Sequence, residues 1–225
     1  VRQNTFNEMS DQLEELIIEL EDEEQKLIDC GKKMLNEYGL TDFTIFSTSI
    51  LNRTLNLNRG YVSLINSNNY IAAAPLVRLN LDSLLRLFAS TQSEYTINEF
   101  CKKVREGESI RKMNYFKNKK IKLRDNELVK LIKNIKGCKW TKDVYETGSG
   151  FIHLSHQHIY SSIKFEKNRI SGGILKTDNI VPTAEKEAGT YYMIKGSKCI
   201  RFFVDDLISA KKSTLPNNSN RCASQ

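Results

Sequence analysis

The chain has 225 residues, of which 40% are hydrophobic and 27% charged, and its formal net charge is +7. This length can bury a sizeable core, and the composition is that of a folded domain rather than a disordered chain. No stretch approaches the roughly 18 to 20 consecutive apolar residues that a membrane-spanning helix needs, and the first thirty residues are acidic, unlike a secretory signal. We therefore expect a cytoplasmic protein that is neither exported nor embedded in a membrane.

The cysteines are five in number, widely scattered and without a C-x-x-C pair. They are Cys30, Cys101, Cys138, Cys199 and Cys222. An odd, scattered set predicts neither a disulfide framework nor a structural zinc site. We expect no cofactor and no bound metal.

The positive charge is concentrated in one part of the chain. Residues 1–30 contain ten acids and two bases, whereas residues 102–142 contain fifteen bases and four acids. Clustered bases are typical of proteins that bind phosphates, so RNA is the expected partner. The alternative is a solvated helical surface whose charge is offset in space by the acidic N-terminal segment. The residues expected to contact RNA are Lys117, Lys119, Lys120, Lys122 and Arg124.

Apolar residues recur with helical spacing over seven stretches, which predicts a mainly all-α fold: a bundle of about six to seven helices. An alternation of apolar and polar residues predicts, in addition, a small β-hairpin near residues 162–175. We expect one helical domain over residues 1–212 and a flexible tail over 213–225. The predicted helices are Met9–Tyr38, Phe43–Ile65, Tyr70–Ser90, Tyr95–Val104, Leu128–Ile135, Trp140–Ile163 and Ala184–Lys212.

The first predicted helix, within residues 1–39, carries an apolar row with a seven-residue repeat. Such a row suits either packing on the rest of the domain or a coiled coil with a partner helix. Glu24 and Gly31 fall on or beside the row, which favours packing within the chain. The row consists of Leu13, Leu20, Leu27 and Met34.

The third predicted helix is apolar nearly all round, yet it carries Arg78, Asp82 and Arg86 four residues apart. This spacing places the three charges on one stripe, and buried charges are costly unless they are paired. One interpretation is a structural ladder that fixes the helix in place. The other is that Arg78 or Arg86 faces a cavity and binds an anion.

All three histidines lie between Gly148 and Tyr160. They are His153, His156 and His158. A zinc pair on a helix would need histidines four residues apart, and a serine nucleophile would need a G-x-S-x-G elbow; neither pattern is present. If the segment is helical, Tyr145, Ser149, His153 and His156 share one face. His153 is then either an acid–base or phosphate-binding residue, acting with a hydroxyl and an arginine from another helix, or a half-buried structural histidine.

Three motifs between Phe43 and Tyr160 resemble a group of bacterial helical proteins related to the HEPN superfamily. They are Arg53 and Arg59 before Gly60 and Tyr61, then Ala74–Asp82, then Val144, Tyr145, Ser149, His153 and Ser155. The resemblance implies an α-helical bundle, often a dimer, in a bacterial defence or toxin–antitoxin system, where many members are metal-independent ribonucleases. It also implies that the catalytic candidates converge inside the bundle. These candidates are His153, Arg78, Ser149, Tyr145 and Asp82.

The sequence departs from the active HEPN ribonucleases at one point. Those enzymes carry an arginine four to six residues before a histidine, whereas the nearest arginine upstream of His153 is Arg124. Two classes of function therefore remain open. The protein either binds RNA and cleaves it without metal, or serves as a non-catalytic module that dimerises or binds a partner protein.

Overall fold

The computed structural model describes residues 10–178 and 180–214, with side chains to residue 209. This part of the chain contains eight α-helices and two short antiparallel strand pairs, which confirms the predicted fold class. The helices are α1 (Asp11–Tyr38), α2 (Asp42–Asn66), α3 (Tyr70–Gln92), α4 (Ile97–Arg105), α5 (Asp125–Ile132), α6 (Trp140–Ile152), α7 (His156–Tyr160) and α8 (Thr183–Thr214). The strands are β1 (Asn114–Tyr115), β2 (Asn118–Lys122), β3 (Ile163–Glu166) and β4 (Arg169–Gly172), and a single 3₁₀ turn, η1, spans Ile110–Lys112.

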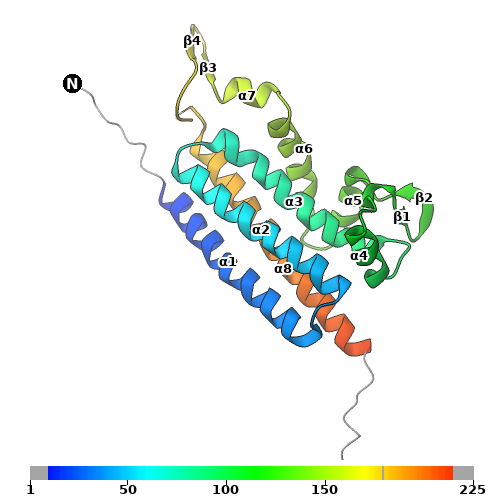
Figure 1. Ribbon diagram of the computed structural model, residues 1–225. Helices are drawn as coiled ribbons and strands as arrows, with labels where there is room; N and C mark the ends of the chain where they lie inside the picture. Colours follow the sequence, from blue (N-terminus) through cyan, green and yellow to red (C-terminus); the bar gives the residue numbers. More distant parts are fainter. Residues whose placement is uncertain (1–9, 179, 215–225) are drawn as a thin grey trace, which may run out of the picture.

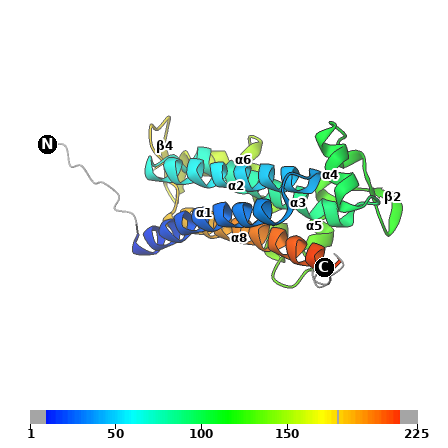
Figure 2. The same cartoon turned by 60° about the horizontal axis from the view of Figure 1, so that its bottom comes forward.

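Four long helices lie side by side and form an elongated bundle (Figures 1 and 2). Helix α1 packs on α2 and α8, and α3 packs on α2, α8 and α6. Helix α3 is the most deeply buried of them, because its apolar residues face neighbours on several sides. Among the described residues, no helix is long and apolar enough to cross a membrane.

The seven-residue row of α1 is buried within the chain. Leu13, Leu20, Leu27 and Met34 are all at most 3% exposed, and their helix lies along α8 and α2. Glu23 lies on the same side of α1, fully buried, and accepts hydrogen bonds from Arg201 of α8. Packing on the same domain, rather than on a partner helix, therefore accounts for this row.

Helix α2 begins directly after its N-terminal cap, Thr41. The Thr41 hydroxyl accepts a hydrogen bond from the backbone N–H of Thr44, and the Thr44 hydroxyl accepts one from the N–H of Thr41. This capping box satisfies donors that the first turn of a helix leaves unpaired. It fixes the boundary between α1 and α2.

The predicted helix Trp140–Ile163 is wrong, because two helices take its place. Helix α6 ends at Ile152, His153 adopts extended backbone angles, and α7 begins at His156. Ser155 causes the break: its hydroxyl accepts a hydrogen bond from the N–H of Gln157 and donates one to the carbonyl of Gly150. A serine that caps a new helix competes with continuation of the old one.

The hairpin predicted near residues 162–175 is confirmed as β3 paired with β4, with Ile163 opposite Gly172 and Glu166 opposite Arg169. A second hairpin, β1–β2, lies between the predicted helices Tyr95–Val104 and Leu128–Ile135, where no strand was predicted. Helix α8 continues to Thr214, two residues past the predicted end of the domain. The rest of the predicted tail, residues 215–225, lies outside the described residues.

Candidate functional site

A network of arginines and aspartates joins α3 to α5. Arg86 of α3 donates hydrogen bonds from Nη2 to Asp82 Oδ1 at 2.7 Å and to Asp125 Oδ1 at 2.6 Å. Asp125 is the first residue of α5, and Arg111 of η1 donates to its other oxygen at 2.6 Å. Arg53 of α2 donates to Asp82 at 3.2 Å. The network therefore ties three helices and the β1–β2 region together.

Arg78 belongs to the same network, although it pairs differently from the predicted ladder. Its Nη2 lies 3.5 Å from Asp125 Oδ2, and its guanidinium lies over the ring of Tyr145 at 4.5 Å from the ring centre. No ion pair joins Arg78 to Asp82 within the described part of the chain. The carboxylate that pairs with Arg78 is therefore Asp125, and not Asp82 as the spacing along α3 suggested.

The most buried pair of this network, Arg78 and Asp125, lies where charges interact strongly. The side chains of Arg78 and Asp125 are only 9% and 10% exposed, whereas that of Arg111 is 61% exposed. Burial acts to raise the pKa of Asp125, but the charge of Arg86 and hydrogen bonds from Arg86 and Arg111 outweigh it and hold this pKa below its usual value. Asp125 is thus ionised at neutral pH and compensates the buried arginines.

Two of the catalytic candidates, His153 and Ser149, do not join this network. His153 follows the last residue of α6, is exposed, and its imidazole makes no hydrogen bond or ion pair with any described residue. The Ser149 hydroxyl donates to the carbonyl of Tyr145 at 2.6 Å, one helical turn back. The expected convergence inside the bundle therefore unites Arg78 with Tyr145 but leaves His153 at the surface.

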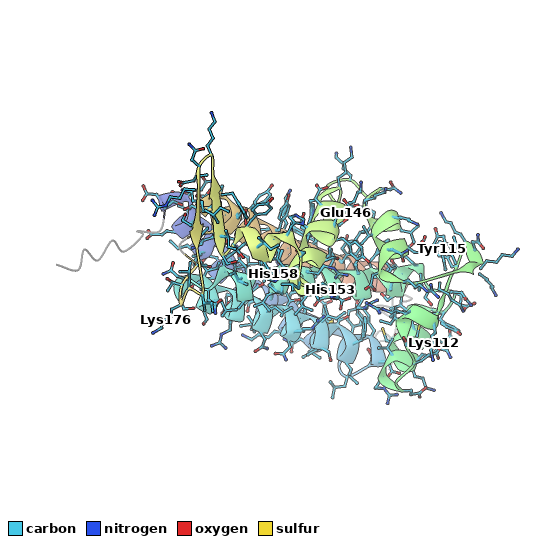
Figure 3. The ribbon with its side chains drawn as sticks, turned by 90° about the horizontal axis from the view of Figure 1, so that it is seen from above. Lys112, Tyr115, Glu146, His153, His158 and Lys176 are labelled. Carbon is cyan, nitrogen blue, oxygen red and sulfur yellow. The ribbon has the colours of Figure 1, made fainter. Side chains whose placement is uncertain are left out.

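The three histidines also separate from one another. The His158 Nδ1 accepts a hydrogen bond from the N–H of Ser155, as part of the cap of α7. His156 contacts the ring of Tyr160, with ring centres 6.1 Å apart. Figure 3 shows His153 and His158 near the α6–α7 junction, away from Lys112 and Tyr115 at one end of the molecule. Among the described residues, no group of three or more His, Cys, Asp or Glu side chains could hold a metal ion.

The expected RNA contacts lie together on what we term the basic lobe, residues 102–142. This lobe projects from one end of the bundle, whereas the acidic α1 lies along α2 and α8 (Figure 1). All five predicted contact residues are exposed. Lys117, Lys120 and Arg124 make no ion pair with a described carboxylate, and Lys117 lies over the ring of Phe116, which is itself 47% exposed.

Two of the predicted contact residues are engaged by other residues of the chain. Lys122 Nζ donates to the carbonyl of Lys112 at 2.8 Å and to Asn114 Oδ1 at 2.6 Å, which ties the β1–β2 hairpin together. Lys119 lies 3.9 Å from a carboxylate oxygen of Glu94. Sequence reasoning did not single out Phe116, Arg111 or Asp125, because their roles depend on pairings made only in the folded chain.

Fold and site together define a helical-bundle protein with an internal arginine–aspartate network and an exposed basic lobe. Comparison of the chain with models of protein families, with curated proteins and with solved structures finds no match. The resemblance to HEPN proteins therefore rests on the motifs given above.

Proposed function

We propose that this protein binds RNA through the basic lobe, as a HEPN-like member of a bacterial defence or toxin–antitoxin type system. The observation that carries the proposal is the exposure of Lys117, Lys120 and Arg124 at one end of the bundle, where they pair with no carboxylate of the described residues. Cations held in this way attract phosphates and release counterions when they bind them. The exposed ring of Phe116, beside Lys117, adds a surface on which an unpaired base can stack.

The arginine–aspartate network serves this function by holding the lobe in place. Asp125 begins α5 inside the lobe and is bound by Arg86 of α3, so the lobe is anchored to the most buried helix. Of the two activities that the resemblance implies, binding has the stronger support. Cleavage would require a cation beside His153, whereas Arg78 is engaged by Asp125 and Tyr145.

The test of binding is fluorescence anisotropy with a labelled single-stranded RNA over a range of salt concentrations. We expect the variant Lys117→Glu/Lys120→Glu to bind more weakly and its salt slope to fall by about 1.4, since each lost phosphate contact on a single strand contributes about 0.7. The matched control is Lys26→Glu/Lys167→Glu, which reverses two exposed lysines outside the lobe. Equal losses of RNA affinity in both variants would show that net charge alone governs binding and would refute the proposed surface.

The test of cleavage uses the same RNA with wild-type protein and the His153→Ala variant, each with and without a chelator. We expect no cleavage that depends on His153. Cleavage that is lost in the variant and insensitive to the chelator would establish a metal-independent ribonuclease instead. Cleavage that the chelator abolishes would point to a metal site.

A second candidate function, dimerisation, is favoured by the exposed apolar side chains of residues 152–175, which we term the apolar arm. The arm comprises the end of α6, α7 and the β3–β4 hairpin, which projects from the bundle (Figure 1). Large apolar side chains exposed close together in one segment are typical of protein interaction sites. Eight large side chains of the arm are between 45% and 108% exposed: Ile152, Leu154, Ile159, Tyr160, Phe165, Ile170, Ile174 and Leu175.

Sedimentation velocity over a range of protein concentrations tests this second function. We expect a concentration-dependent dimer that Leu154→Glu and Ile170→Glu weaken, because each places a charge in the apolar contact. Ile18→Glu is the matched control, since Ile18 is 59% exposed on α1, outside the arm. A monomer at every concentration would refute dimerisation, as would an equal effect of Ile18→Glu.

A further inference from the structure

A cavity of about 420 Å³ lies between α3, α6, α7 and the beginning of α8. Ala74 and Val77 of α3 form part of its wall, and Val181 and Pro182 close it where the chain enters α8. Its volume falls within the range of roughly 300 to 1,000 Å³ that is usual for small-molecule sites. No residue of the basic lobe or of the arginine–aspartate network is among those that line the cavity, although Gly148, which packs on Arg78, is.

Aromatic rings from four helices line this cavity. Tyr70 of α3 and Phe151 of α6 meet edge to face, with ring centres 5.9 Å apart, and Tyr192 of α8 and Tyr160 of α7 complete the set. Tyr70 is fixed in position, because its hydroxyl donates to the backbone carbonyl of Glu185. A planar ligand would therefore meet ring faces and edges on several sides.

The lining of the cavity includes two carboxylates, and its hydroxyl, amide and imidazole groups can donate as well as accept hydrogen bonds. Asp143 and Glu185 line it, and no described lysine or arginine does, although the protein has a net charge of +7. Neither of these carboxylates forms an ion pair with any described residue. Gln157 also lines the cavity, but its Oε1 lies against Gly150 of α6 and does not face the cavity.

We infer that this cavity binds a small aromatic molecule that carries a cationic amidine or amine group. The ring occupies the space between Tyr70, Phe151 and Tyr192, where aromatic packing and cation–π attraction both stabilise a positively charged aromatic ligand. The cationic group reaches Asp143 or Glu185, to which it donates charge-assisted hydrogen bonds. The same carboxylates repel phosphates and carboxylic acids, so the site selects against the anions that the basic lobe attracts.

The single tryptophan of the chain provides a direct measurement. Trp140 stacks on Tyr192, with ring centres 6.1 Å apart and an angle of 21° between the planes, and Tyr192 lines the cavity. A ligand that contacts Tyr192 is expected to change the tryptophan fluorescence. Titration with benzamidine as the probe, and with benzamide and benzoate as its neutral and anionic counterparts, tests both the ring and the charge.

We expect a saturable fluorescence change with benzamidine, a Kd at least about tenfold weaker for benzamide, and no binding of benzoate. The variant Asp143→Asn/Glu185→Gln, which keeps the shape of the cavity, should weaken benzamidine binding by at least about tenfold. The matched control Asp22→Asn/Glu21→Gln changes two exposed acids on α1 and should bind benzamidine like the wild-type protein.

Three results would overturn the inference: no saturable change with benzamidine, equal binding of benzoate, or unchanged binding in the cavity variant. Far-ultraviolet circular dichroism of both variants establishes that they are folded before the comparison is made. Since the titration contains no RNA, its result is independent of the RNA-binding proposal.

Discussion

Replacement of Asp125 by alanine tests the network that joins the basic lobe to the bundle. The Asp125 carboxylate accepts hydrogen bonds from Arg86 and Arg111 and lies 3.5 Å from Arg78. In Asp125→Ala the buried Arg78 loses its only described carboxylate partner, and Arg86 keeps only Asp82. Breaking a buried pair from one side typically costs about 3 to 5 kcal/mol, because it leaves an uncompensated charge.

The loss of stability in Asp125→Ala should fall in the lower part of that range. Arg86 retains its bond to Asp82, and Arg111 is 61% exposed, so its lost pair contributes no more than about 1 kcal/mol. We expect Asp125→Ala to lower the free energy of unfolding by about 3 kcal/mol in urea denaturation. Asp22→Ala, an exposed aspartate on α1, is the control and should change it by less than about 0.5 kcal/mol.

The same residue predicts the pH dependence of stability. Its pKa in the folded protein lies below the unfolded value, so the ionised form stabilises the fold. This stabilisation is fully present above the unfolded pKa, about 3.9, and is lost as the pH falls through the lower folded value. Between about pH 6 and pH 3, wild-type protein should therefore lose more stability than Asp125→Ala does. A loss in Asp125→Ala equal to that in Asp22→Ala, or parallel pH profiles for wild type and Asp125→Ala, would refute the reasoning.

Four further substitutions probe the helices of the bundle, each measured by urea denaturation. In Gly148→Ala the new Cβ would lie 2.8 Å from Arg78 Cβ, so we expect the free energy of unfolding to fall by about 1 to 3 kcal/mol. In Gly60→Ala the new Cβ would meet its nearest atom at 3.5 Å, so we expect the free energy of unfolding to rise by about 0.5 to 1 kcal/mol. Equal effects of the two substitutions would contradict this reasoning. Glu23→Ala leaves its arginine partner on α8 uncompensated and should cost about 3 to 5 kcal/mol, and a cost below about 1 kcal/mol would show that the pair is dispensable. Thr41→Ala removes the capping box of α2 and should lower the free energy of unfolding by about 1 kcal/mol. An unchanged midpoint of urea denaturation would rule this out.

The helices could be predicted because their signals are local. The row of apolar residues in α1 and the threonine cap of α2 lie within a few residues of the structure that they determine. The split between α6 and α7 was missed although its signal is also local. Ser155 and His158 form a capping box, but the apolar periodicity across the break favoured one continuous helix.

The candidate site could be predicted only in part, because its pairings are long-range. The spacing of Arg78, Asp82 and Arg86 correctly placed three charges on one stripe of a buried helix. It could not show that Asp125, 39 residues beyond Arg86, enters the same network. Sequence spacing determines which side chains share a face of one helix, whereas the packing of helices determines which carboxylate meets which arginine.

The position of Tyr145 explains how the buried charges are balanced. Inside the network Arg78 and Arg86 face two aspartates, and Asp82 is already bound by Arg86 and Arg53. Arg78 therefore has one carboxylate, at the longer distance of 3.5 Å, and the face of the Tyr145 ring lies on its guanidinium. A ring face attracts a desolvated cation by about 2 kcal/mol, comparable with a hydrogen bond to a charged group. Gly148 lies one turn after Tyr145 and lets α6 approach α3 closely enough for this contact, which connects the predicted cost of Gly148→Ala to the electrostatics of the network.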